Sequence, residues 1–102
     1  MKILVVASTR EEIAPLLENL RFQWDINKRL HKYLYKSTNV DVLICGVGMV
    51  SMSYWMGKTL AEHQYNYCLN LGYAGSYYRD LNLGDLVNVA QDVMAVSYTH
   101  LR

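Results

Sequence analysis

Apolar and polar positions along the chain predict short strands alternating with helices. Residues 2–8, 40–45 and 66–71 are short, nearly continuous apolar runs, which is the pattern of strands buried on both faces of a sheet. Apolar residues recur at helical spacing over residues 10–20, and a second helix is predicted from about residue 50 to residue 63. Strands that alternate with helices in this way favour a parallel sheet with helices packed on it.

The start of the first helix carries a local signal. Thr9 is a plausible N-cap, and Glu12 follows three residues later, which fits a capping box. Pro15 stands early in this helix, where its missing N–H costs little. We therefore predict that the helix begins directly after the first strand.

Three further segments complete the predicted order. Residues 21–38 are expected to form short antiparallel strands, and HKYLYKS is the clearest of them. LVNV, at residues 86–89, is expected to be a fourth strand beside the three buried ones. We interpret residues 95–102 as a non-native tail, because VSYTHLR resembles translated adapter sequence and no covering helix follows the last strand. The predicted domain is therefore residues 1–94.

Composition excludes several classes of protein. With 52% hydrophobic residues, 19% charged residues and a net charge of +1, the chain can form a core, so disorder is not expected. Lys and Arg are not clustered, which argues against nucleic-acid binding, and the apolar runs are too short to cross a bilayer. Cys45 and Cys68 lie within apolar runs without metal-ligand spacing, so we expect buried, reduced thiols, no metal and a cytoplasmic protein.

Three turns follow the three predicted buried strands, at residues 8–12, 46–49 and 72–76. Because parallel strands end at the same edge of a sheet, these turns are expected to converge there, and that edge is where open α/β sheets bind ligands. This convergence is the strongest functional signal that the pattern itself provides.

Each turn allows more than one interpretation. Glu12 can stabilise the start of its helix, or it can face the crevice and activate a water molecule. The second turn, GVGMVS, lacks the third glycine of a dinucleotide-binding motif, so Gly46 and Gly48 more simply let a ligand approach the backbone. Amides of the third turn can bind a base or a water, or this turn can serve only to reverse the chain.

Four segments in this order, MKILVVASTREEIAPLL, CGVGMV, NLGYAGSY and LNLGDLVNV, resemble the nucleoside phosphorylase/nucleosidase superfamily. The resemblance covers about residues 1–94 and lies closest to the hydrolase branch, most of all to futalosine hydrolases. It implies an α/β, three-layer, phosphorylase/hydrolase-like fold with a mostly parallel central sheet, of which this chain holds the N-terminal part.

The resemblance also implies a role for each matched residue. Glu12 matches the glutamate that activates the attacking water. The resemblance implies that the ribose and its 5′ substituent are contacted by Thr9, Val47 and Gly48. It also implies that the base is held by a segment that contains Tyr73, Ala74 and Gly75. Tyr73 departs from the family pattern, because related hydrolases carry a small residue there.

The implied reaction is hydrolysis of the base–ribose bond of a purine-type nucleoside, most closely futalosine to hypoxanthine and dehypoxanthine futalosine. The first turn, ASTREE, lacks the glycine-and-arginine phosphate loop of the phosphorylases, so water is the expected nucleophile and no cofactor is expected. A methylthioadenosine/S-adenosylhomocysteine nucleosidase and a purine nucleoside phosphorylase are alternatives, and a non-catalytic nucleotide-binding domain is an alternative of another class.

Two residues of the family's C-terminal half have no counterpart in this sequence, namely the aspartate that protonates the base and the glutamate that grips the ribose hydroxyls. The chain alone is therefore expected to be inactive, and the full-length protein is expected to be a homo-oligomer that binds neither nucleic acid nor membrane.

Overall fold

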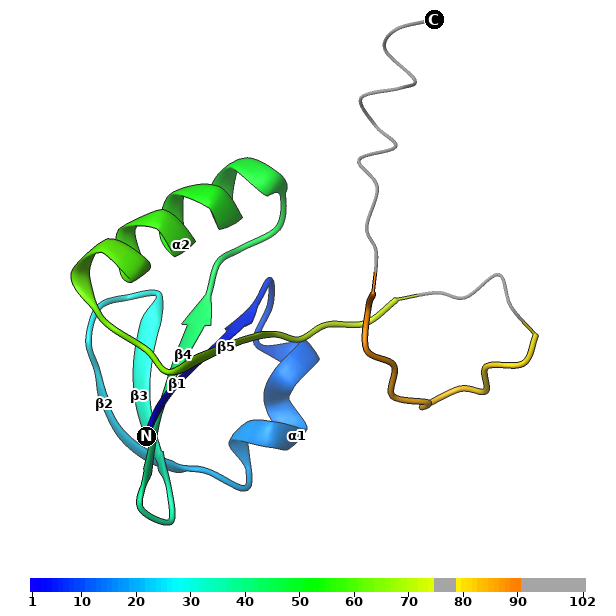
Figure 1. Cartoon of the computed structure of the whole chain (residues 1–102), viewed down its shortest axis with the longest axis horizontal. Coiled ribbons are helices and arrows are strands. Elements are labelled where there is room, and N and C mark those ends of the chain that lie inside the picture. The colour runs from blue at the N-terminus through cyan, green and yellow to red at the C-terminus, as the bar shows by residue number, and fades with distance from the viewer. Residues whose placement is uncertain (75–78, 91–102) are drawn as a thin grey trace, which may run out of the picture.

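A computed structural model describes residues 1–74 and 79–90 of the chain. Their core is a five-stranded sheet in the order β2-β3-β4-β1-β5 (Figure 1). The strands are β1 (Lys2–Ala7), β2 (Arg21–Asp25), β3 (Leu30–Tyr35), β4 (Thr38–Ile44) and β5 (Tyr67–Asn70). The helices are a 3₁₀ turn (η1, Glu11–Ile13), α1 (Ala14–Leu17) and α2 (Met49–Glu62). The predicted α/β class and the predicted second helix are thus confirmed.

The directions of the strands follow from the lengths of their connections. β4 and β5 both pair in parallel with the central β1, whereas β3 is antiparallel to β4 and β2 is antiparallel to β3. β2 therefore runs in the same direction as β4, and β3 is the reversed strand of the five. The links between β2, β3 and β4 are short turns that force reversal, whereas α2 provides the long crossover from β4 to β5 that a parallel arrangement requires.

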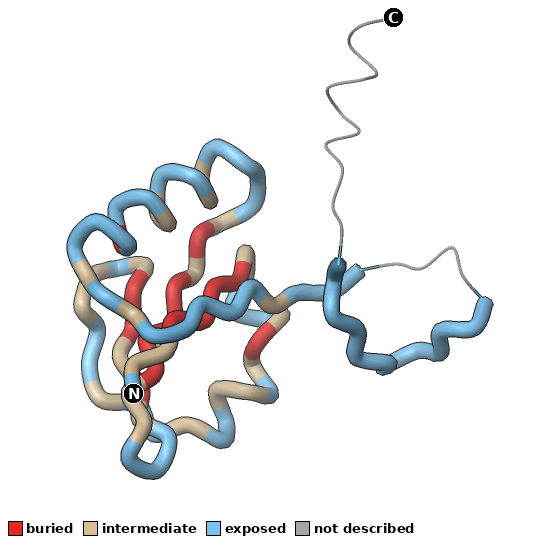
Figure 2. Tube along the Cα trace, in the orientation of Figure 1, coloured by how far each residue is buried: buried red, intermediate tan, exposed pale blue. Residues whose placement is uncertain are grey.

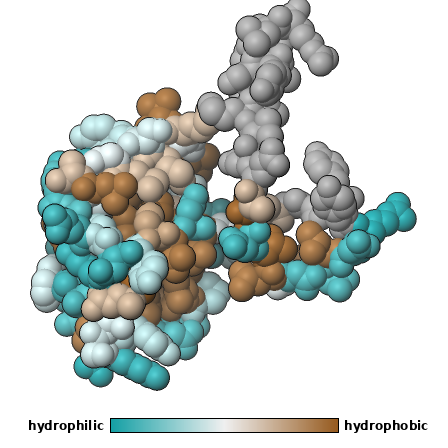
Figure 3. All heavy atoms as spheres, in the orientation of Figure 1, coloured by the Kyte–Doolittle hydropathy of each residue, from teal (hydrophilic) through white to brown (hydrophobic). Residues whose placement is uncertain are grey.

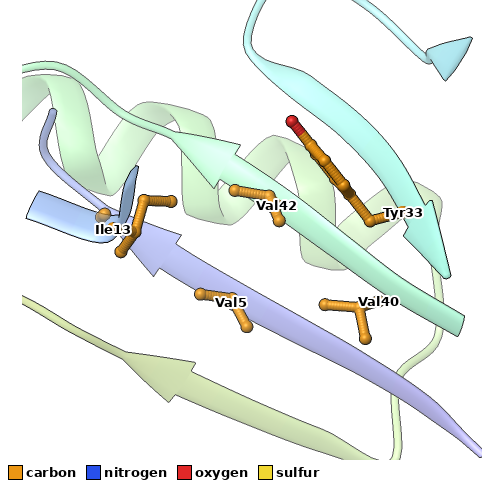
Figure 4. Close-up of a cluster of buried hydrophobic side chains, with 6 residues drawn as sticks. Val5, Ile13, Tyr33, Val40 and Val42 are labelled. Atoms are coloured by element: carbon orange, nitrogen blue, oxygen red, sulfur yellow. The ribbon is translucent and has the colours of Figure 1, made fainter. Parts of the chain in front are cut away.

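The two faces of the sheet are covered by different helices, so the fold has three layers (Figure 1). Along β1, Val5 and Ala7 belong to the core cluster on the α1 side, which also contains Ile13 of η1 (Figure 4). Leu4 and Val6, with the opposite parity, belong to the cluster that packs against Met52, Trp55 and Met56 of α2. β1 is therefore buried on both faces, as its continuous apolar sequence predicted.

The first helix is shorter than the sequence suggested. The apolar spacing predicted a helix over residues 10–20, but regular α-helix covers only Ala14–Leu17 and follows a 3₁₀ turn. The residue at the N-cap of this turn is Arg10, and Thr9 makes no side-chain cap. One half of the capping box is nevertheless present, because the backbone N–H of Thr9 donates a hydrogen bond to Oε2 of Glu12 at 3.3 Å.

Two predictions for the second half of the chain were wrong. All four residues of β5 are exposed, although their apolar sequence predicted a buried strand (Figure 2). This strand lies at the edge of the sheet, so only β1 contacts it through hydrogen bonds. Residues 86–89, predicted to be a strand, have no regular secondary structure, and Leu86 is 95% exposed. They face β5 across a groove of about 640 Å³ and make no ladder with it.

Two expectations concern residues outside the described ranges. Gly75 and the tail at residues 95–102 lie there, so the structure does not test either of them. Among the helices of residues 1–74 and 79–90, none is long and apolar enough to cross a membrane.

Candidate functional site

The three turns predicted to converge lie side by side at one edge of the sheet. Ala7, the last residue of β1, is opposite Ile44 of β4, and Val6 is opposite Asn70 of β5. Backbone hydrogen bonds continue beyond the strands, because the N–H of Cys45 donates to the carbonyl of Ala7 at 2.9 Å. The first turn is therefore flanked by the second on one side and by the third on the other.

The Glu12 side chain spans the space between the first turn and the third. Its Oε2 accepts a hydrogen bond from the Thr9 N–H at 3.3 Å. Its Oε1 lies 3.6 Å from the point where a Cβ on Gly72 would stand, so the carboxylate rests against the backbone of the third turn. Glu12 is half-buried, and its carboxylate lies at the carboxyl edge of the parallel strands, which is where open α/β sheets in general bind ligands.

Tyr73 links the same two turns on the outside. Its hydroxyl donates a hydrogen bond of 3.0 Å to the backbone carbonyl of Glu11, while the side chain as a whole is 71% exposed. The large residue that departs from the family pattern therefore directs its hydroxyl at the peptide next to Glu12. Ala74 follows it and is exposed at the same edge.

The second turn presents backbone and one apolar side chain. Gly46 and Gly48 have φ angles of +83° and +105°, a region that favours glycine. The N–H of Gly46 donates to the carbonyl of Ser8 at 2.9 Å, which ties this turn to the first. Val47 is 80% exposed at the edge. The first and third turns are joined by the side chains of Glu12 and Tyr73, whereas the second turn is joined to the first by backbone hydrogen bonds.

Sequence reasoning missed one residue that belongs to this edge. Arg29 comes from the turn between β2 and β3, and its Nη1 lies 3.0 Å from the point where a Cβ on Gly46 would stand. Nothing in the local sequence connects a charged residue of a hairpin with a glycine turn much further along the chain. The contact depends on the pairing of β3 with β4, which only the fold reveals.

No family model matches this chain, but individual proteins do. It is 27% identical over 96 residues to a 5′-methylthioadenosine/S-adenosylhomocysteine nucleosidase of Hydrogenovibrio crunogenus, covering 91% of this chain and 41% of that relative. The same type of nucleosidase from S. pneumoniae, solved with the transition-state inhibitor MT-ImmA, matches with a TM-score of 0.71 and 26% identity over 83% of this chain and 38% of that one. A futalosine hydrolase mutant of Helicobacter pylori matches with a TM-score of 0.66 and 27% identity, covering 83% of this chain and 40% of that chain.

The structural matches agree with the layered α/β fold. In sequence and fold the chain is similar to the N-terminal part of nucleosidases of the nucleoside phosphorylase/nucleosidase superfamily. It spans about two fifths of the length of the curated relative. The resemblance of the four sequence segments is thus confirmed.

Proposed function

We propose that this chain supplies the water-activating part of a purine nucleosidase, with Glu12 as the general base. The observation that supports this role is the position of its carboxylate. It is held at the carboxyl edge of the parallel strands by the Thr9 N–H and rests against Gly72 of the third turn. A general base must be fixed within hydrogen-bond reach of the proton that it removes, and two turns fix this one.

The reaction follows the logic of glycoside hydrolysis. As the bond between base and ribose breaks, the sugar gains oxocarbenium character, and a water molecule attacks it. Glu12 accepts a proton from this water, while its negative charge stabilises the cationic sugar. Protonation of the departing base requires a general acid. By family resemblance this acid is an aspartate from the part of the nucleosidases that the chain does not match.

Substrate contacts are assigned to the remaining predicted residues. Val47 and Gly48 lie on the second turn with accessible surface, which suits contact with the ribose and its 5′ substituent. Thr9 lies beside Glu12 and completes the ribose side. The segment from Tyr73 to Gly75 is assigned to the base, with the backbone of this turn as its polar surface.

The first candidate substrate is methylthioadenosine or S-adenosylhomocysteine, because the curated relative and the S. pneumoniae structure both carry that activity in their names. Futalosine is the second candidate, because a futalosine hydrolase mutant matches with nearly the same TM-score. The sequence motifs alone favoured futalosine. The similarity to methylthioadenosine/S-adenosylhomocysteine nucleosidases supports that substrate type at least as well.

A chimeric enzyme tests the proposal. The matched part of this chain replaces the corresponding segment of the Hydrogenovibrio crunogenus nucleosidase, and circular dichroism measures whether the chimera folds. Released adenine from methylthioadenosine and hypoxanthine from futalosine are measured by chromatography, with and without phosphate. We expect hydrolysis of methylthioadenosine that does not require phosphate. Preference for futalosine would favour the second candidate, and a strict need for phosphate would identify a phosphorylase.

The role of Glu12 is tested by Glu12→Gln, which keeps the shape and removes the base. The rate should fall about a hundredfold or more. Glu11→Gln is the matched control, since Glu11 is an exposed neighbour of the same charge, and it should stay within about twofold of the parent. Full activity of a folded Glu12→Gln chimera would exclude Glu12 as the base. A folded chimera that cleaves none of these nucleosides would favour a non-catalytic nucleotide-binding domain.

A further inference from the structure

The turn between β2 and β3 holds Arg29 in a defined place. Oδ1 of Asn27 accepts hydrogen bonds from the backbone N–H groups of Arg29, at 2.8 Å, and Leu30, at 2.9 Å. The carbonyl of Arg29 in turn accepts the N–H of Ile44 at 2.9 Å. The backbone of Arg29 is therefore fixed next to the end of β4, where the second turn begins.

The guanidinium group of Arg29 reaches three parts of the structure around that turn. Its Nη1 donates to the carbonyl of Ile44 at 3.5 Å. Its Cζ lies 5.5 Å from the centroid of the Trp55 ring on α2, within the range of a cation–π contact. It also covers Gly46, where an added Cβ would approach Nη1 to 3.0 Å. The group thus connects the end of β4, the turn itself and the helix that follows.

The second turn depends on such external contacts. Gly48 has open space around the position of a Cβ, and Val47 is exposed, so side-chain packing at these two positions does not hold the turn. Its backbone is joined to the rest of the fold through the Gly46 N–H, which donates to the Ser8 carbonyl, and the Gly48 carbonyl, which accepts the Met52 N–H. The carbonyls before the turn are instead bound by side chains, Ile44 by Arg29 and Cys45 by the Ser51 hydroxyl. Gly46 and Gly48 both have positive φ angles. Because glycine adopts negative φ angles as readily as positive ones, the sequence alone does not hold this backbone conformation.

We propose that Arg29 is a positioning residue that fixes the Gly46–Gly48 backbone for binding of the ribose side of a nucleoside. The nucleoside ligand in this inference rests on the proposed function, whereas the contact between Arg29 and the second turn does not depend on it. A planar guanidinium is suited to the place, because it can stack on an indole and donate to a carbonyl at the same time, which a lysine ammonium does less well.

The first experiment uses the chain as it is, without any ligand. Amide hydrogen exchange at the start of the second turn is followed by NMR in the parent, in Arg29→Met and in Lys28→Met. It is measured for Cys45 and Gly46, whose N–H groups are hydrogen-bonded to the carbonyls of Ala7 and Ser8. Lys28 is an exposed residue of the same charge in the same turn as Arg29, so its substitution controls for the loss of charge. We expect Arg29→Met to speed exchange at these two amides about tenfold and Lys28→Met to leave it unchanged. Equal exchange in both variants would overturn the proposal.

The second experiment uses the chimeric nucleosidase with methylthioadenosine. A residue that only orders a binding segment should raise KM and leave kcat unchanged, so we expect Arg29→Met to raise KM about tenfold with kcat within twofold. Arg29→Lys should recover only part of the affinity. The proposal would be contradicted if Arg29→Met lowered kcat about tenfold without changing KM. It would also be contradicted if Arg29→Lys kept the KM of the parent. If the folded parent chimera is inactive, the proposed function fails, and hydrogen exchange alone still decides the role of Arg29.

Discussion

The hydroxyl of Tyr65 donates a hydrogen bond of 2.7 Å to Oδ2 of Asp41, a fully buried carboxylate on β4. Nζ of Lys2 lies 4.0 Å from the same oxygen and 5.0 Å from the centroid of the Tyr65 ring. Within the described part of the chain, Oδ1 of Asp41 has no hydrogen-bond partner. The segment before β5 is therefore joined to the sheet through a buried polar cluster rather than through apolar packing alone.

Removal of the Tyr65 hydroxyl should destabilise the fold. Tyr65→Phe leaves the buried Asp41 without its hydrogen bond, and an unsatisfied buried group of this kind costs about 1–3 kcal/mol. Urea unfolding followed by circular dichroism measures the loss. Tyr67→Phe is the control, because Tyr67 is exposed on β5, and it should change stability by less than about 0.5 kcal/mol. Equal midpoints for the two variants would show that the Tyr65 hydrogen bond contributes nothing.

The same tyrosine should make stability sensitive to alkaline pH. Burial, followed by the hydrogen bond to Asp41, raises the pKa of the Tyr65 phenol well above its usual value. Because the folded pKa is the higher one, the stabilisation is complete below the unfolded pKa of about 10 and is lost as pH rises beyond it. Urea unfolding at pH 8, 10 and 11 should show a steeper loss for the parent than for Tyr65→Phe. Parallel curves would disprove this linkage.

Exposed apolar surface should cause the isolated chain to associate. Hydrophobic residues are exposed on the face of the molecule shown in Figure 3, and Leu69 of β5, Leu86 and Val87 are all exposed around the groove beside that edge strand. Uncovered strand edges and apolar patches promote association. Leu69→Lys should lower the apparent mass in size-exclusion chromatography with light scattering, whereas Leu60→Lys on α2 tests whether any added charge has this effect. A parent that stays monomeric at high concentration would contradict the prediction.

The sequence predicted those elements whose pattern is local. β1, β4 and α2 were found within one or two residues, because a continuous apolar run or a helical period identifies each one without its neighbours. The exposure of β5 could not be predicted from its apolar sequence, since it depends on whether another part of the chain covers this edge strand. The position of Glu12 at the edge of the sheet could be predicted, because its turn directly follows β1. The direction of the Tyr73 hydroxyl and the approach of Arg29 to Gly46 depend on tertiary contacts between distant segments.

Two glycines should respond in opposite directions to the same substitution. Gly46 has a φ of +83°, and a Cβ there would lie 3.0 Å from Nη1 of Arg29 and 3.2 Å from Oγ of Ser51. Gly46→Ala therefore combines a strained backbone with a close contact and should cost at least about 1 kcal/mol. Gly57 lies within α2 with nothing within 4 Å of an added Cβ, so Gly57→Ala should stabilise the chain by about 0.5–1 kcal/mol through higher helix propensity.

Urea unfolding of both variants measures the difference. Gly48→Ala separates the two causes of the loss at Gly46, because Gly48 has a φ of +105° with open space for a Cβ, so that only backbone strain remains. If Gly46→Ala destabilises more than Gly48→Ala, the contacts of Arg29 and Ser51 around Gly46 account for the additional loss. If the two variants unfold alike, the guanidinium moves away at little cost, and the close packing of Arg29 against the second turn is weaker than its geometry indicates.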